Sequence, residues 1–308
     1  MQGSASLKFR SKIRKIINCR WLYLMLLPCI LNFVIFHYVP MYGLQIAFKR
    51  YNIVLGAQAS PWIGLKHFEN FFSSYYCSEV ILNTLRISLV SICVGFPFPI
   101  VFALILNEVR SRRARSFFQT VSYLPYFLAV VIVVGILRIF LEQDGIVNAI
   151  HQLLYGNKVY YLGEPKYFLT LYESMGLWRW TGYDAILYLA AMSTVNQDLY
   201  EAAAVDGAGR LSRIWHVTLP GIRSTIIVLF IMRLGNLLNV GWQEILLLQN
   251  DLNEGVSEVI QTFVYKRGIQ KADYGFSTAV GLLQSVINFA MIVAANQISK
   301  RFSNTYIF

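Results

Sequence analysis

A row of polar side chains interrupts the apolar stretch near residues 221–247. If this stretch is a helix, a step of 100° per residue brings the row within about 140° of one face. An arginine inside a bilayer costs roughly 2.5 to 3.5 kcal/mol on insertion scales, so its side chain should face protein or water. Guanidinium, amide and carboxylate groups on one face can hydrogen-bond a polar solute. The row consists of Arg233, Asn236, Asn239, Gln243 and Glu244.

Aromatic side chains near this row could act as apolar platforms for the same solute. We expect them to be Trp242, together with Trp180 and Tyr183, which come shortly before Asp184 in the apolar stretch near residues 174–194. A purely structural role remains open for each residue. Arg233 could pair with Asp184 or a backbone carbonyl, the asparagines could join helices, and the tryptophans could form the aromatic belt at the membrane surface.

Three other arginines, Arg86, Arg138 and Arg179, lie near the ends of apolar stretches. We expect their long side chains to reach the headgroup region rather than a solute path. A glycine and two prolines at Gly95, Pro97 and Pro99 predict a broken helix in the second apolar stretch, since proline removes a backbone donor. A static kink is the alternative to a moving one.

Catalytic chemistry is not indicated. No G-x-x-x-x-G-K-[ST] phosphate loop occurs, so we expect no ATP to be bound by this chain in that way. The four histidines and four cysteines are scattered, which predicts neither a metal site nor a nucleophile pair nor a disulfide framework. We therefore predict no catalytic residue and no metal. The cysteines are Cys19, Cys29, Cys77 and Cys93.

The composition predicts the surroundings of these elements. Hydrophobic residues make up 56% of the 308 residues and charged residues 14%, whereas soluble domains carry about 25% charge. The mean hydropathy is +0.50. These values indicate an all-α integral membrane protein, because a bilayer span needs roughly 20 mostly apolar residues. Six stretches qualify, near residues 21–39, 80–106, 117–140, 174–194, 221–247 and 275–299.

The basic residues predict the orientation. Residues 1–20 carry lysines and arginines without an acid, so this tail should stay in the cytoplasm, and six spans return the C-terminus to the same side. The same alternation places the arginines of residues 110–115 and the loop 195–220 inside. If the fourth or fifth stretch were instead a buried amphipathic helix, this loop would face outward. The net charge of +11 favours anionic lipid as a partner over nucleic acid, since the basic residues cluster beside membrane ends.

The loop 195–220 has a helix–turn–helix pattern. Good helix formers from Glu201 to Val205 are interrupted by Gly207 and Gly209, and the pattern resumes before Pro220, which predicts a turn at Gly207. The spacing resembles the EAA signature of the permease subunits of bacterial ABC importers, in which this loop docks into the cytoplasmic ATPase. An ordinary amphipathic surface hairpin is the alternative. The resemblance implies coupling roles for Glu201, Ala202, Ala203, Asp206, Gly207, Leu219 and Pro220.

The resemblance extends along nearly the whole chain. The stretches 232–250 and 259–288, the early basic tail and the first outer loop at 62–68 are similar to the polysaccharide-type permeases of the maltose-transporter-like carbohydrate class. That class implies the type I importer fold, with residues 21–308 as the permease domain in a bacterial plasma membrane. It also implies a second, homologous permease subunit, two ATP-binding subunits that carry the ATP and magnesium, and an extracellular solute-binding protein.

These observations predict a non-catalytic subunit that forms half of a translocation pathway for an oligosaccharide. Sugars combine hydroxyls with apolar ring faces, which suits the polar row and its aromatic neighbours. Arg233 suggests a carboxylate-bearing ligand such as a uronic acid oligomer, although a neutral or glycan-derived sugar remains open. A secondary active transporter would need paired intramembrane carboxylates, of which only Asp184 lies well inside a predicted span. A membrane-embedded enzyme would need a catalytic constellation, and none converges.

Overall fold

The computed structural model describes residues 19–303, which are almost entirely helical. Their one isolated β-bridge joins Lys49 to Trp62. The all-α prediction is therefore confirmed for this part of the chain. Of the basic tail expected at residues 1–20, all but Cys19 and Arg20 lie outside the described residues.

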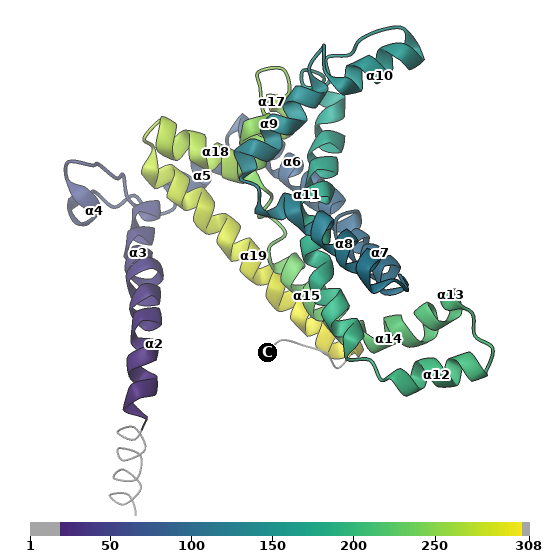
Figure 1. Cartoon of the computed structure of the whole chain (residues 1–308). Coiled ribbons are helices and arrows are strands. Elements are labelled where there is room, and N and C mark those ends of the chain that lie inside the picture. Colours follow the sequence, from purple (N-terminus) through teal and green to yellow (C-terminus); the bar gives the residue numbers. More distant parts are fainter. Residues whose placement is uncertain (1–18, 304–308) are drawn as a thin grey trace, which may run out of the picture.

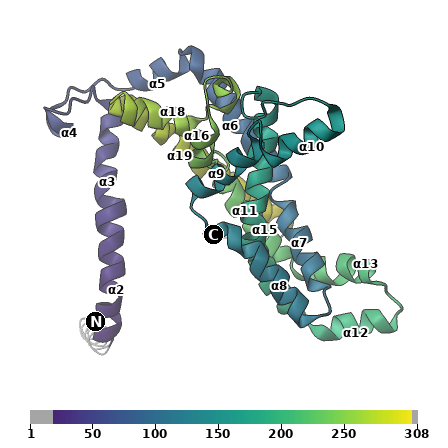
Figure 2. The same cartoon turned by 45° about the horizontal axis from the view of Figure 1, so that its top comes forward.

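The N-terminal helix stands clear of the other helices (Figures 1 and 2). It comprises α2 (Arg20–Phe33), a π-turn η1 (Val34–Tyr38), α3 (Val39–Met41) and the 3₁₀ segment η2 (Tyr42–Phe48). No residue of α2 is buried, and η2 is the part that packs against the long C-terminal helix α19 (Tyr274–Ser303). This helix therefore gains little from packing within its own chain.

The second apolar stretch forms α6 (Tyr75–Cys93) and α7 (Pro97–Asn107). The regular α-helix is interrupted at residues 94–96, which confirms the predicted break. The third stretch, which was expected near residues 117–140, is not a single straight helix. It consists of α8 (Arg112–Tyr123), the 3₁₀ turn η3 (Leu124–Phe127) and α9 (Val130–Leu141), bent by 102° where Leu128 and Ala129 are extended. Pro125 lies in that turn and supplies no backbone donor.

The longest internal helix, α11 (Pro165–Ser193), has 29 residues and spans about 43 Å. It packs against α7 through a cluster of buried apolar side chains that includes Ala103, Ala185 and Met192. By length and apolar composition, three of the described helices could cross a membrane, or five if each of two bent pairs counts as one span. Polar residues lower the hydropathy of α11, which is long enough but lies outside this set.

The fifth stretch is also broken, so the polar row does not lie on one continuous helix as we expected. Helix α15 (Arg223–Gly235) ends before Asn236, and α16 (Trp242–Leu248) begins six residues later. Polar side chains of α19 satisfy the backbone of the break, because Leu238 N–H donates to Asn288 Oδ1 at 3.2 Å and Gln284 Nε2 donates to Leu238 C=O at 2.8 Å. Non-helical backbone is stable at membrane depth only when it is satisfied in this way.

Short helices gather at the two ends of the molecule (Figures 1 and 2). One end carries α4 (Gly56–Ala59), α5 (Lys66–Phe72), α10 (Ile146–Tyr155), α17 (Glu254–Ser257), α18 (Ile260–Tyr265) and the π-turn η5 (Lys266–Gln270). The other end carries a hairpin of α12 (Gln197–Val205), α13 (Arg210–Arg213), η4 (Ile214–Thr218) and α14 (Leu219–Gly221). The start of α2 and the end of α19 lie at the hairpin end.

A charge cluster holds the segment after α16 together, which the sequence placed in an outer loop. Lys266 Nζ lies 2.5 Å from a carboxylate oxygen of both Glu254 and Glu258. The hydrogen bond from Lys266 holds the pKa of the Glu254 carboxyl below its usual range. This loop is therefore a folded cap over the helices.

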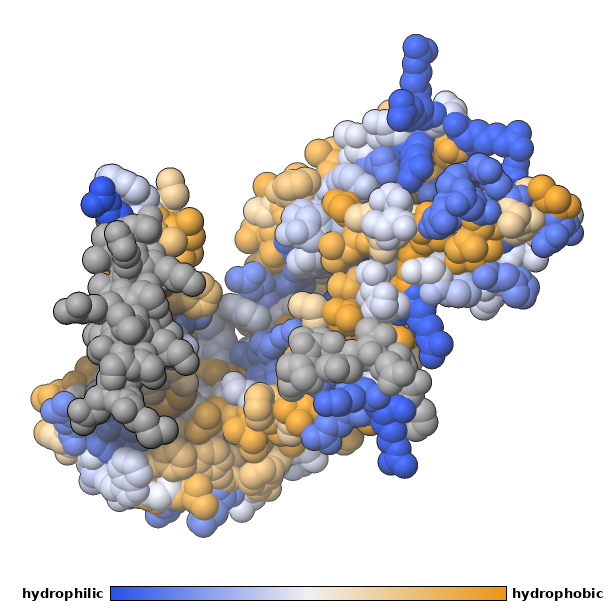
Figure 3. Space-filling view, turned by 90° about the horizontal axis from the view of Figure 1, so that it is seen from below, coloured by the Kyte–Doolittle hydropathy of each residue, from blue (hydrophilic) through white to orange (hydrophobic). Residues whose placement is uncertain are grey.

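Apolar residues cover much of the outer surface (Figure 3). Many large apolar side chains are more than half exposed in the isolated chain, among them Trp21, Phe36, Val131 and Phe289. Exposed apolar area on this scale indicates contact with lipid or with other proteins.

Candidate functional site

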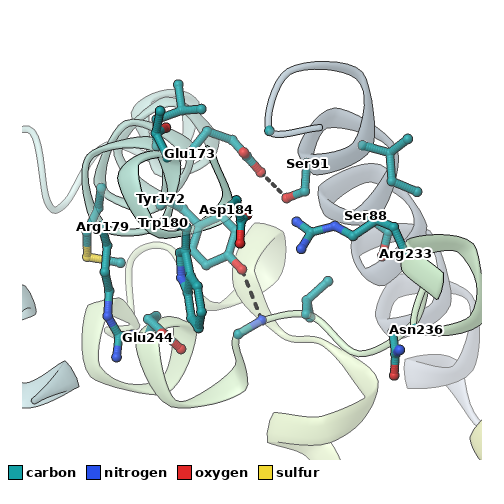
Figure 4. Close-up of a pocket in the computed structure, with 18 of the residues that line it drawn as sticks. Ser88, Ser91, Tyr172, Glu173, Arg179, Trp180, Asp184, Arg233, Asn236 and Glu244 are labelled. Atoms are coloured by element: carbon teal, nitrogen blue, oxygen red, sulfur yellow. Dashed lines mark hydrogen bonds and ion pairs between the residues drawn. The ribbon is translucent and has the colours of Figure 1, made fainter. Parts of the chain in front are cut away.

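A polar cavity of about 300 Å³ lies between α6, α11 and the broken segment from α15 to α16 (Figure 4). Three segments distant in the sequence therefore contribute side chains to one site. Its charged lining consists of two guanidinium groups and three carboxylates, and polar and aromatic groups surround them. These residues include Ser88, Ser91, Tyr172, Glu173, Arg179, Trp180, Asp184, Arg233, Asn236, Asn239 and Glu244.

One ion pair is buried in the wall of the cavity. Arg179 Nη1 on α11 donates to Glu244 Oε1 on α16, and both residues are only 9% exposed. The guanidinium also lies 5.1 Å from the ring centroid of Trp180. Our expectation that Arg179 reaches the headgroups was wrong, because α11 begins at Pro165 and places Arg179 near its middle. A buried charge is stable only with a partner, and Glu244 supplies it.

Arg233 remains without such a partner. It makes no ion pair within 4.0 Å with a carboxylate among residues 19–303, so the structural alternative, in which Arg233 pairs with Asp184, is not formed. In Figure 4 its guanidinium group points into the cavity, toward the side that carries Asp184 and Glu173. Arg233 is therefore the cation of the lining that is available to a solute.

Glu173 was not among the residues predicted for the solute path. This residue lies on α11, and its carboxylate accepts a hydrogen bond from the Ser91 hydroxyl on α6. Glu173 and Asp184 are three helical turns apart on α11, so both face the cavity. Asp184 is thus accompanied on α11 by a second carboxylate, which lies one residue before the stretch that we predicted near residues 174–194. The spacing of the two acids could have revealed this, had the helix been extended toward Pro165.

The cavity collects six of the nine residues that we predicted for the solute path, namely Trp180, Asp184, Arg233, Asn236, Asn239 and Glu244. The other three do not line it. Tyr183 stacks on Tyr126 with ring centroids 3.7 Å apart, and Trp242 packs against Tyr265 at 5.4 Å. Gln243 is exposed elsewhere. The break between α15 and α16 accounts for Trp242 and Gln243, because these residues begin a separate helix and do not continue the face of α15. Tyr183 lies on α11 and is held by its stacking on Tyr126.

The two asparagines of the break differ in their contacts. Asn239 Oδ1 accepts hydrogen bonds from Gln284 at 2.9 Å and Asn288 at 3.3 Å, both on α19. Asn239 thus joins helices, which was the structural alternative for this residue. Asn236 Nδ2 donates a hydrogen bond to Met232 C=O at 3.1 Å, and Asn236 Oδ1 accepts one from Asn239 Nδ2 at 3.0 Å. Asn236 is exposed at the cavity. At the start of α16, Gly241 N–H donates to the hydroxyl of Tyr172 at 3.0 Å.

The second site is the hairpin at the far end of α11. Helix α12 ends at Val205 with Asp206 as its C-cap, and Gly207 adopts a φ of +78°, so the predicted turn is confirmed. Ala208 N–H donates to Ala203 C=O at 2.8 Å, which closes the end of the helix as glycine-dependent caps do. One side-chain hydrogen bond of 3.0 Å, from the Tyr200 hydroxyl to Thr218 Oγ1, ties the two arms.

The predicted coupling residues lie along this hairpin. Glu201, Ala202, Asp206, Gly207 and Pro220 are exposed, whereas Ala203 and Leu219 are half-buried. Large apolar side chains share the exposed surface, including Val205, Leu211 and Trp215. The hairpin extends beyond the ends of the long helices (Figure 1). Such a surface suits docking to another protein.

Known proteins match this chain along most of its length. A family model described as a binding-protein-dependent transport system inner membrane component matches residues 95–304. Protein LplB of Bacillus subtilis (strain 168) is 42% identical over 290 residues, which are 94% of this chain and 91% of LplB. The polygalacturonan/rhamnogalacturonan transport system permease protein YteP of the same organism is 40% identical over 295 residues, 96% of this chain and 92% of YteP.

A solved structure matches as well. It is the crystal structure of a bacterial alginate ABC transporter in complex with an alginate pentasaccharide-bound periplasmic protein. One of its chains superposes with a TM-score of 0.88 and 41% sequence identity, covering 96% of this chain and 99% of that chain.

Proposed function

Because this chain belongs to the family of binding-protein-dependent transport system inner membrane components, we propose that its polar cavity forms half of the path by which an acidic oligosaccharide crosses the membrane. The family membership confirms the resemblance found in the sequence. The chain is a non-catalytic permease subunit of an ABC importer for oligosaccharides. The identity of the sugar and the roles of single residues are the subject of the proposal.

The observation that carries the proposal is the position of Arg233. Its guanidinium points into the cavity, and no carboxylate of residues 19–303 forms an ion pair with it, whereas Arg179 is neutralised by Glu244. A free guanidinium in a partly desolvated site is a bidentate receptor for a carboxylate, as found on a uronic acid. Trp180 adds an apolar platform and Asn236 an amide for hydroxyls. The permease YteP and the alginate transporter are named for acidic polysaccharides, which supports this choice of substrate.

The nearby acids restrict how an acidic sugar can bind. Glu173 and Asp184 share the cavity with Arg233 and would repel a second carboxylate. A uronate must therefore sit on the Arg233 side, while its hydroxyls donate hydrogen bonds to Glu173 or Asp184. This arrangement selects a sugar residue that carries one carboxylate and several hydroxyls.

The other subunits follow from the same family. We expect a second, homologous permease to complete the path, two ATP-binding subunits to carry ATP and magnesium, and an extracellular solute-binding protein to deliver the sugar. The alginate transporter with its pentasaccharide-bound periplasmic protein supports the last of these partners. The exposed N-terminal helix, which packs on its own chain mainly through η2, leaves room for the second permease.

The membrane topology belongs to the proposal too. Six spans in a bacterial plasma membrane would place both termini and the hairpin in the cytoplasm. The ends of α2 and α19 lie on the hairpin side, which supports this orientation (Figure 1). The exposed hairpin would seat against the ATPase through Glu201, Ala202 and Asp206, with Leu219 and Pro220 fixing its exit toward α15.

An uptake experiment with a matched pair of sugars tests the cavity. The probes are a radiolabelled galacturonic acid trimer and the same trimer with its carboxyl groups reduced to alcohols. In cells that express the importer, we expect Arg233→Gln to reduce uptake of the acidic trimer at least tenfold. Arg86→Gln is the control, because Arg86 is an exposed arginine of α6 that does not line the cavity.

The proposed preference of the cavity for acidic sugars is wrong if Arg233→Gln leaves uptake of the acidic trimer unchanged while the protein is present at its normal level. A loss of equal size for the reduced trimer would assign Arg233 to the structure of the path rather than to carboxylate recognition. Arg233→Lys should retain part of the uptake, since it keeps the charge but loses the bidentate geometry.

A further inference from the structure

Helix α10 buries a polar residue and exposes its apolar ones. Leu153 is 86% exposed and Leu154 70%, and both share a face with the exposed Ile146 and Ile150. Asn148, on the opposite side of the helix, is fully buried. In a helix that packed on its own protein the apolar side would face inward. The apolar face of α10 therefore requires a partner outside this chain.

The first turn of α10 is fixed at the end of α9. A side chain at Gly145 would come within 2.5 Å of the carbonyl oxygens of Ile139 and Phe140, so the backbone approaches α9 as closely as glycine allows. The Asn148 amide donates to Leu141 C=O at 3.3 Å and to Glu142 C=O at 2.9 Å. The apolar helix α9 ends at Leu141, and polar residues follow it. The start of α10 therefore lies at the boundary between the apolar region and water.

The polar side of α10 is tied to the segment that follows the helix. Asn148 accepts a hydrogen bond from Val159 N–H at 2.9 Å and donates to Val159 C=O at 3.0 Å. His151 Nδ1 lies 2.9 Å from Asn157 C=O. These contacts fix the orientation of α10 about its own axis, so its apolar face points away from the segment that follows the helix. Figures 1 and 2 show α10 projecting sideways from the upper end of α11.

We propose that α10 is an interfacial helix, whose apolar face lies in the lipid leaflet at the end of the molecule opposite the hairpin. A helix of this kind lies in the plane of the membrane surface with its apolar side among the acyl chains. The helix itself carries no lysine, arginine or acid, and the exposed Tyr155 and Tyr160 lie at its end and shortly after it. Tyrosine favours the level of the headgroups.

Lipid is the occupant that the surroundings favour over a protein. Helix α9, which precedes α10 in the chain, also exposes large apolar side chains, and Val131, Ile132 and Ile139 share one side of it. Both helices thus present an apolar face outward, as helices in contact with lipid do. The proposal concerns anchoring of this end of the permease, and it is independent of which sugar is carried.

Spin-label accessibility in the assembled importer, reconstituted in lipid nanodiscs, tests the placement of α10. The four native cysteines are first replaced, and uptake confirms that the cysteine-free protein works. Three variants, Leu153→Cys, Ile150→Cys and Gln152→Cys, are then made separately, and a nitroxide is attached to the single new cysteine of each. Collision rates are measured with oxygen, which concentrates in lipid, and with a nickel chelate, which stays in water.

At Leu153→Cys and Ile150→Cys we expect the collision rate with oxygen to exceed the collision rate with the nickel chelate by at least threefold. At Gln152→Cys, on the polar side, the nickel chelate should give the higher rate. Strong nickel contact at all three positions would show that α10 lies in water and would overturn the proposal. Low contact with both reagents at the two apolar positions would place a protein partner there and would overturn it as well.

Discussion

The cavity and the hairpin differ in what holds them. The turn of the hairpin depends on neighbours in the sequence, with a helix capped by Asp206, a left-handed Gly207 and one side-chain hydrogen bond between its arms. The cavity depends on groups from α6, α11 and α16 that are distant in the sequence and satisfy each other's charges and donors. A locally built element can move as one body, whereas the cavity changes shape only when its helices shift. This difference suits a lever at one site and a solute path at the other.

The largest expected effect is at the turn of the hairpin. We predict that Gly207→Asp abolishes uptake, to less than about 1% of the parent, while the amount of protein in the membrane stays normal. Aspartate tolerates a positive φ at modest cost, so the turn should still form. The new carboxylate would then stand in the proposed ATPase contact. Uptake and mass spectrometry of co-purified proteins measure the two effects, and the ATPase should be lost.

Gly207→Asn is the matched control, because asparagine has the same shape and tolerance of positive φ without the charge. It should retain more uptake and more co-purified ATPase than Gly207→Asp. Normal uptake by the aspartate variant would contradict the coupling role of the hairpin, whatever its effect on the turn.

The buried ion pair should give the next effect. Glu244→Gln leaves Arg179 buried without a counter-charge, which we expect to destabilise the folded protein by about 3 to 5 kcal/mol. Thermal inactivation of the purified importer in detergent measures this loss. The double variant Arg179→Met with Glu244→Leu should recover most of it, since neither charge remains. Unchanged stability of Glu244→Gln would show that the pair does not hold α11 and α16 together.

The smallest effect should come from the contact between the arms of the hairpin. Tyr200→Phe removes the hydroxyl that donates to Thr218, a bond that contributes about 1 kcal/mol. Amide hydrogen exchange in the hairpin should rise about fivefold, while exchange in α11 stays the same. Tyr75→Phe, at an exposed tyrosine of α6, is the control. Faster exchange throughout the chain would mean that the hairpin is not an independent unit.

These contrasts also explain what could be predicted from the sequence. The turn at Gly207 and the break near Pro97 follow from the conformations of single residues, so local patterns predicted both. The cavity was found only in part. The break between α15 and α16 is stabilised by Gln284 and Asn288 from α19, and no pattern within residues 221–247 reveals contacts with that helix.

The role of Arg179 in the wall of the cavity and the presence of Glu173 in its lining were not predicted, for a related reason. Their roles depend on where α11 begins, and the hydropathy of the sequence places the start of the apolar stretch later than the helix itself. Charged residues lower the hydropathy of a span where they line a polar site, so the boundaries of such a helix are hardest to predict at its functional part.

The separation of the N-terminal helix from the other helices has a consequence for biogenesis. None of the residues of α2 is buried against later parts of the chain. This helix can therefore enter the membrane, and reach its final environment, while the remainder of the protein is still being synthesised. Helix α11 differs, because its buried arginine needs the carboxylate of Glu244, which leaves the ribosome 65 residues later. Insertion of the chain thus begins with a self-sufficient anchor and is completed only when its polar helices find one another.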